Sequence, residues 1–395
     1  MFARRTGWNQ RENAYAAALR TARQNGVKLL DLTVSNPTEC GFEFDSAAIA
    51  SALAHSESLH YEPHPSGLLQ ARKSVAGYYN SRPMAASERV ISPEQILLTT
   101  STSEAYSFLF RLLCDPGDNV LVPLPSYPLF EFLADIQDVQ LQPYPLFYDH
   151  GWHIDLGRLR ERIGSTTRAI LVVNPNNPTG SFVHGAELDA LVQICSDRDI
   201  ALIADEVFLD YQIEAPAEAS AAFCCGCLSF ALSGLSKISC LPQMKLAWLV
   251  VNGPAALRQA ALSRLEIIAD TYLSVSGPIQ HGVLELLDQR RTIQPQLLSR
   301  IRTNLGKLDD ELKGAPSIQR LRVEGGWYAV LRVPAVQTDE GLCIELMNRG
   351  VVVHPGHFYD FSTEGHLVLS LIAPSDVFQD GIKTVFEVLS SPSHR

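Results

Sequence analysis

The chain has 395 residues, of which 46% are hydrophobic and 19% charged, so it is long enough for two domains with a large core. Its 32 basic and 43 acidic residues give a formal net charge of −11, which argues against binding of nucleic-acid phosphates. No apolar run approaches the roughly 18 residues of a membrane span, and residues 1–20 lack an apolar signal segment. We therefore expect a soluble, cytoplasmic protein with neither nucleic acid nor membrane as a partner.

The eight cysteines are too few for a disulfide framework in a chain of this length. Three of them cluster at Cys224, Cys225 and Cys227, but no second Cys or His pair follows at the spacing of a zinc site. We expect buried apolar cysteines and no metal.

The amino-terminal part predicts a helix over residues 12–24, a stop at Gly26 and a strand-like stretch over 27–34, before the sequence Ser-Asn-Pro-Thr. This segment could pack on either domain. Short apolar runs then recur with the character of strands buried on both faces. Helical patterns at 103–114 and 185–198 lie between the runs, which occupy residues 95–100, 119–123, 168–173, 200–204, 228–232 and 246–251. This alternation predicts an α/β fold with a mostly parallel sheet sandwiched by helices.

After about residue 275 the pattern changes to a long helix over 279–312, which we expect to be interrupted at Pro295, and then to strands around 320–333 and 366–371. The predicted division is a large domain over 45–275 and a smaller α+β domain formed by 1–44 together with 276–395.

Polar residues follow several of the predicted strands, where an open parallel sheet binds its ligands. The hydroxyl-rich stretch 99–104 leads into a helix and suits a phosphate, although such stretches are also ordinary helix caps. Residues 174–180, with the sequence Asn-Pro-Asn-Asn-Pro-Thr-Gly, form a shaped loop or a plain turn.

An acid and a lysine follow the next two predicted strands. Asp205 alone reads as a cap or ion-pair partner, and Lys237 alone as a surface lysine. Together with the hydroxyl-rich stretch, however, they supply what pyridoxal 5′-phosphate needs, namely a phosphate anchor, a partner for the ring nitrogen and an imine donor.

These motifs, in this order and spacing, resemble the class I/II aminotransferases, the fold type I pyridoxal-phosphate enzymes, from the Ser-Asn-Pro-Thr sequence to the last strand. The resemblance implies a large domain with a sheet of the seven-stranded type. It implies that Lys237 forms the internal aldimine and carries the proton in catalysis. It also implies that Asp205 keeps the ring nitrogen protonated, that Asn177 donates to the phenolic oxygen O3′, and that Tyr127 stacks on the ring.

The same resemblance assigns the phosphate site to hydroxyl side chains, Ser101, Thr102, Ser103 and Ser236. Tyr61 matches a tyrosine that reaches the phosphate site of the neighbouring subunit, which implies a homodimer with shared active sites.

Three positions depart from the family pattern. Phe208 replaces a tyrosine that supports O3′, so the imine is expected to have a higher pKa. Lys245 replaces a phosphate-binding arginine and keeps the charge without the bidentate fork. Val368 stands where an arginine would bind the substrate carboxylate, and no arginine occurs between Gly350 and Pro374.

Other residues must then meet the substrate, and the candidates by position are Asn36, Trp327, His357, Tyr359 and His366. For each histidine, an ordinary hydrogen-bonded role is an equally good interpretation.

The favoured hypothesis is an aminotransferase with an amino donor and a 2-oxo acid acceptor as partners, serving a biosynthetic process. A pyridoxal-phosphate lyase, an amine-directed transaminase and a non-catalytic cofactor-binding regulator are the alternatives.

Overall fold

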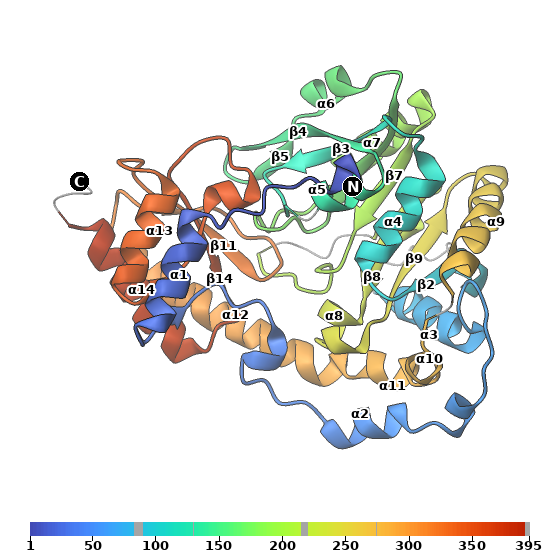
Figure 1. The fold of residues 1–395 in the computed structure, drawn as a ribbon, viewed down its shortest axis with the longest axis horizontal. Helices are drawn as coiled ribbons and strands as arrows, with labels where there is room; N and C mark the ends of the chain where they lie inside the picture. Colours follow the sequence, from blue (N-terminus) through green and yellow to red (C-terminus); the bar gives the residue numbers. More distant parts are fainter. Residues whose placement is uncertain (83–89, 129, 215–219, 274, 392–395) are drawn as a thin grey trace.

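The computed structural model describes residues 1–395 except 83–89, 129, 215–219, 274 and 392–395. The largest sheet in this part of the chain has eight strands, in the order β2-β9-β8-β7-β6-β3-β4-β5 (Figure 1). The strands are β2 (Ile96–Thr99), β3 (Asn119–Leu124), β4 (Gln140–Tyr148), β5 (Trp152–Ile154), β6 (Thr167–Val173), β7 (Ala201–Asp205), β8 (Ser229–Gly234) and β9 (Ala247–Asn252). Neighbours from β8 through β4 pair in parallel, whereas β9 and β5 run antiparallel. The predicted α/β fold with a mostly parallel sheet is confirmed.

All six predicted strands of the middle region are present, but β4 and β5 were not predicted and extend the sheet beyond the expected seven strands. The reason is local, since β4 carries Pro143 and Pro145, and proline within an apolar run argues against a strand. The short β5 pairs with the end of β4 as an antiparallel edge.

Alternate residues of the central strands pack against helices on opposite faces of the sheet. Ile203 belongs to the core under α4 (Thr102–Leu113), α5 (Phe130–Ile136) and α9 (Ala255–Tyr272). Its neighbours Leu202 and Ala204 belong to the core on the other face. The helices on that face are α3 (Leu69–Asn80), α6 (Leu156–Arg162), α7 (Gly185–Arg198), α8 (Leu235–Ile238) and α11 (Val283–Asp288). Burial on both faces explains the continuous apolar character of these strands.

A second, four-stranded antiparallel sheet lies to one side of the first, in the order β10-β11-β14-β13 (Figure 1). Its strands are β10 (Gln319–Arg320), β11 (Tyr328–Arg332), β13 (His354–Pro355) and β14 (His366–Ser370). Helices α1 (Ala14–Gln24), α12 (Arg290–Leu312), α13 (Asp339–Asn348) and α14 (Ser375–Leu389) pack around this region in one apolar cluster.

The amino-terminal segment packs on the same side as the small sheet. Its strand is shorter than the expected 27–34, because only β1 (Leu30–Asp31) forms, pairing in parallel with β12 (Val351–Val352). Helix α1 begins at Ala14 and not at residue 12, since the Asn13 side chain accepts a hydrogen bond from the Ala16 amide at 2.7 Å and caps the helix. The proposed domain division at residues 45 and 275 stays a prediction.

The expected interruption at Pro295 is wrong, because α12 continues through this residue. A proline removes one main-chain hydrogen bond, and the buried residues Ile293 and Leu297 on either side hold this helix in the core. The predicted 279–312 helix is instead broken earlier, into α10 (Gly277–His281), α11 and α12. None of the helices in the described part combines the length and apolar character needed to cross a bilayer.

The break between α10 and α11 coincides with a close contact to α2 (Ser46–Leu53). A Cβ atom on Gly282 would lie 2.3 Å from the carbonyl oxygen of Ala52. We therefore expect Gly282→Ala to lower the free energy of unfolding by about 1–3 kcal/mol, measured by denaturant titration. Gly306→Ala, in α12 with no atom within 4 Å of the new Cβ, is the matched control and should gain up to about 1 kcal/mol. Equal stability of the Gly282 variant would contradict the close-packing argument.

Candidate active site

A cavity of about 280 Å³ lies beyond the carboxyl ends of β6, β7 and β8. Nine residues that the sequence assigned to the cofactor line it: Ser101, Thr102, Ser103, Tyr127, Asn177, Asp205, Phe208, Ser236 and Lys237. These residues come from five separate segments, so the strand order of the sheet is what brings them together.

The amino end of α4 forms one wall of the cavity. Ser101 caps the helix, because its hydroxyl accepts a hydrogen bond from the Glu104 amide at 3.1 Å. Glu104 turns back and accepts from the Thr100 amide at 2.6 Å. The cap fixes the first turn, and Thr102 and Ser103 of this turn line the cavity, so the helix start suits an anion.

The loop 174–180 is shaped by two of its asparagines and leaves the third facing the cavity. Asn174 accepts from the Val183 amide at 2.9 Å, and Asn176 donates to the carbonyl oxygen of Pro125 at 3.0 Å. The buried Asn177 lines the cavity, and its Oδ1 atom has no hydrogen-bond partner among the described residues. A buried amide oxygen without a partner is costly, so the position favours a ligand at Asn177.

Asp205 ends β7 at the floor of the cavity and is buried. Its Oδ2 atom accepts a hydrogen bond from the phenol of Tyr106 at 2.7 Å, and its Oδ1 atom accepts from the Val207 amide at 3.2 Å. Burial raises the pKa of this carboxyl, while the Tyr106 hydrogen bond, the Val207 amide and the charge of Lys237 lower it. A cationic group in the cavity would therefore stabilise the Asp205 carboxylate.

Lys237 lies in the short helix α8, directly after β8. Tyr211 holds this turn by donating from its phenol to the main-chain oxygen of Lys237 at 2.6 Å. Burial lowers the pKa of the Lys237 amine to about 8, against the opposing effects of Cys240 and Asp205. Such an amine is unprotonated far more often at neutral pH than an exposed lysine, which makes it a competent nucleophile.

Tyr127 and Phe208 supply the aromatic walls. Tyr127 follows β3 and remains 42% exposed, with its ring at the cavity and edge to face with Phe130 at 6.4 Å. Phe208 is buried and packs edge to face on Trp327 at 5.1 Å. An exposed ring on a loop suits stacking on a bound planar group, whereas Phe208 offers no hydroxyl to one.

Several of the other predicted residues do not line the cavity. Lys245 and His357 are exposed, and Tyr61 is 81% exposed. Asn36 is engaged locally, accepting from the Thr38 amide and donating to Glu39.

Two aromatic candidates for substrate contact are also engaged elsewhere. The Tyr359 hydroxyl lies 3.1 Å from Nδ1 of His354, and His366 is bonded to the carbonyl oxygen of Thr363 and stacks on Phe361.

The structure places Ser35 and Tyr328 at the cavity, where the sequence pointed to their neighbours Asn36 and Trp327. Trp327 is fully buried behind Lys237 and makes no wall of its own. Tyr106, the partner of Asp205, also went unpredicted. Ser35 differs from Asn36, and Tyr328 from Trp327, only in which side chain faces the cavity. A local sequence motif does not predict this difference.

The Val368 position belongs to the core of the small sheet. Val368 pairs with Val330 and with His354 across the strands and is 1% exposed. Among the described residues that line the cavity, none is an arginine.

The polar groups that line the cavity fit pyridoxal phosphate. Among the described residues, Asn177 Oδ1 has no hydrogen-bond partner and Asp205 forms no ion pair, and burial lowers the pKa of Lys237. The hydroxyl-rich amino end of α4 faces the same space. A group with a phosphate, a basic ring nitrogen, an aldehyde and a phenolic hydroxyl would meet all four positions.

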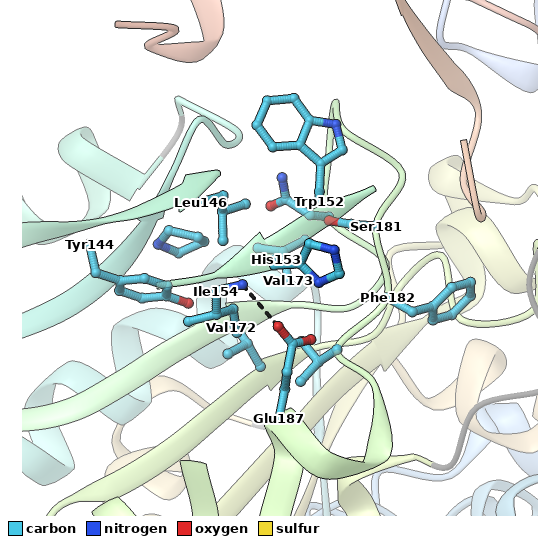
Figure 2. Close-up of a pocket in the computed structure, with 13 residues that line it drawn as sticks. Tyr144, Leu146, Trp152, His153, Ile154, Val172, Val173, Ser181, Phe182 and Glu187 are labelled. Atoms are coloured by element: carbon cyan, nitrogen blue, oxygen red, sulfur yellow. Dashed lines mark hydrogen bonds between the residues drawn. The ribbon is translucent and has the colours of Figure 1, made fainter. Parts of the chain in front are cut away.

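A second crevice lies between the β4–β5 hairpin and the segment 181–183 (Figure 2). Glu187 crosses its floor and accepts from the Ile154 amide at 2.9 Å. The crevice encloses only about 10 Å³, about the space of one water molecule, so it holds no substrate. In the described part of the chain, no three His, Cys, Asp or Glu side chains are placed to hold a metal ion.

The fold and the cavity together define an enzyme of the pyridoxal-phosphate type, and the chain belongs to the family "Aminotransferase class I and II", whose model matches residues 27–376. It is 24% identical to glutamate-pyruvate aminotransferase AlaA of Haemophilus influenzae, over 93% of this chain and 92% of that protein. It is 25% identical to the alanine aminotransferase of Mycobacterium tuberculosis, over 87% of this chain and 81% of that protein.

The structure of the alanine aminotransferase from Pyrococcus furiosus superimposes with a TM-score of 0.87 at 21% identity, covering 98% of this chain and 99% of that one. At this identity the likeness establishes the fold. The relatives are named as aminotransferases, which favours that function over the lyase, amine-directed and regulatory alternatives.

Tyr106→Phe tests the role of the Asp205 carboxylate. Loss of the hydrogen bond should raise the pKa of Asp205 further and slow the change of the cofactor spectrum on adding an amino acid roughly tenfold. Tyr144→Phe is the control, because its phenol donates to the carbonyl oxygen of Leu171 at 2.8 Å, away from the cavity. Equal rates in the Tyr106 variant and the wild type, or equal slowing in both variants, would contradict this role.

Proposed function

We propose that this chain transfers an amino group from an amino acid to a 2-oxo acid, with pyridoxal phosphate held in the cavity. The observation that carries the proposal is that Lys237 and Asp205, at the ends of neighbouring strands, face one cavity with a hydroxyl-rich helix start. Lys237 supplies the amine and Asp205 the carboxylate on which this chemistry depends.

When bound, the cofactor supplies an electron sink that weakens the bonds at the substrate α-carbon. Each protein group then has one task. Lys237 would hold the cofactor through its aldehyde, with loss of water, and as a free amine would move the proton of the substrate α-carbon through Nζ. Asp205 would hold a proton on the ring nitrogen, Asn177 would orient the phenolic oxygen, and Tyr127 would pack on the ring. The hydroxyl side chains Ser101, Thr102, Ser103 and Ser236 bind the phosphate.

The substrates to test first follow from the named relatives, which act between glutamate and pyruvate or on alanine. Because no arginine lines the cavity among the described residues, the substrate carboxylate must be met by neutral donors or by another subunit.

Tyr61 supports the proposal of a homodimer with shared sites. It is 81% exposed and lies outside the cavity of its own chain, so it would reach a phosphate in the site of a partner subunit. Exposed apolar side chains such as Leu59, at 89%, are also consistent with a protein surface that another subunit covers. The expected cytoplasmic location stays a prediction, for which cell fractionation is the test.

Lys237→Ala should abolish both the visible band of the protein-bound cofactor and its conversion by alanine or glutamate. In the wild type the band should shift to that of the pyridoxamine form on adding the donor and return on adding pyruvate or 2-oxoglutarate. Lys383→Ala, an exposed lysine in α14, should behave as the wild type. A Lys237 variant that keeps the band and the reaction would contradict the proposal.

Sharing of sites is tested by mixing Lys237→Ala with Tyr61→Ala after mild denaturation and refolding together. Each mixed dimer would hold one site with both native residues, so activity should recover to about a quarter of the wild-type value, while each variant alone stays low. Sedimentation analysis should give a dimer. A mixture no more active than its parts would contradict site sharing.

A further inference from the structure

The amine of Lys237 lies over the faces of two aromatic rings. Its Nζ atom is 4.5 Å from the ring centre of Trp327 and 5.3 Å from that of Phe208. The two rings pack edge to face, with centres 5.1 Å apart and planes at 70°. Phe208 follows β7 of the large sheet and Trp327 precedes β11 of the small one, so both halves of the fold meet at this amine.

Trp327 is held rigidly in this position. It is fully buried, its ring packs edge to face on Tyr211 at 5.3 Å, and Tyr211 in turn holds the main chain of Lys237. The indole nitrogen of Trp327 has no hydrogen-bond partner among the described residues. A buried indole without a partner is unfavourable, so packing alone does not account well for a tryptophan here.

The other groups near the Lys237 amine do not fully offset the effect of burial on its pKa. Asp205 and Cys240 both act to raise the pKa of Lys237, and the Tyr211 phenol is committed to the main-chain oxygen. Burial works against the ammonium form and dominates. A ring face within 6 Å attracts a cation, and the attraction is strongest for tryptophan and for a desolvated cation.

We propose that Trp327, assisted by Phe208, is a positioning residue for Lys237, whose ring face stabilises the ammonium form of the amine and holds Nζ at the cavity wall. This inference deepens the proposed function, since it concerns the amine that would bind the cofactor and move the substrate proton. When Nζ takes a proton from the substrate α-carbon, a positive charge forms beside the Trp327 ring. The ring lowers the free energy of that charged state, and the proton stays on Nζ because the ring does not accept it.

The test uses the protein without cofactor, so it does not depend on transamination. Trace reductive methylation with formaldehyde and cyanoborohydride modifies unprotonated amines, and its rate at Lys237 from pH 6 to pH 10, normalised to the exposed Lys383, gives the titration midpoint by peptide mass spectrometry. We expect Trp327→Leu to lower the midpoint by about one pH unit and Trp327→Phe by about half as much or less.

Trp152→Leu is the matched control. Trp152 is also buried, in β5, and its indole nitrogen also lacks a partner, but its ring packs on Tyr148 and Phe361. This variant should leave the Lys237 midpoint unchanged. An unchanged midpoint in Trp327→Leu, or an equal shift in Trp152→Leu, would overturn the inference.

If circular dichroism shows that Trp327→Leu does not fold, Phe208→Leu is the second variant to test. It removes the more distant ring, so a smaller downward shift is expected, and no shift would contradict the inference. If the titration midpoint of Lys237 is unchanged in these variants while amino acids still convert the cofactor in the wild type, the aromatic role fails and the proposed function stands. If the midpoint shifts as expected but no amino acid converts the cofactor in the wild type, the aromatic role stands and the proposed function fails.

Discussion

The site depends on one constraint, the parallel pairing of β6, β7 and β8. Parallel strands bring their carboxyl ends to the same edge of a sheet, so the residues that follow each strand meet there although they are far apart in sequence. The loop after β6, Asp205 at the end of β7 and Lys237 after β8 occupy consecutive positions along that edge. The apolar interiors of the strands, packed against helices on both faces, hold the edge in place.

The low polarity of this edge sets the chemistry. Burial lowers the pKa of Lys237 and raises that of Asp205, so each group is shifted toward its neutral form in the absence of a partner. The cationic ring nitrogen of a cofactor would give Asp205 a counter-charge. The unprotonated amine of Lys237 would be available as a nucleophile for the cofactor aldehyde. Tyr106 and the aromatic rings of Trp327 and Phe208 act in the opposite direction and keep each group within reach of its charged form.

Most of the large sheet could be predicted from local patterns, and the family resemblance added lining residues of the cavity such as Tyr127, Asn177 and Phe208. Apolar runs gave the six strands of the middle region, and the residues just beyond them line the cavity. The pattern misled where tertiary contacts override local preference, as at Pro295 inside α12 and at the prolines of β4. It also could not separate Ser35 from Asn36 or Tyr328 from Trp327, since a shift of one residue exchanges which side chain faces the cavity.

The central claim is that Lys237 is the amine that binds the cofactor. The most direct measurement is borohydride reduction of the protein with pyridoxal phosphate, which would lock the cofactor onto the reacting lysine as a secondary amine, followed by peptide mass spectrometry. We expect a single labelled peptide that carries the added mass on Lys237. A label on Lys245 or on another lysine, or no label at a saturating concentration of cofactor, would contradict it.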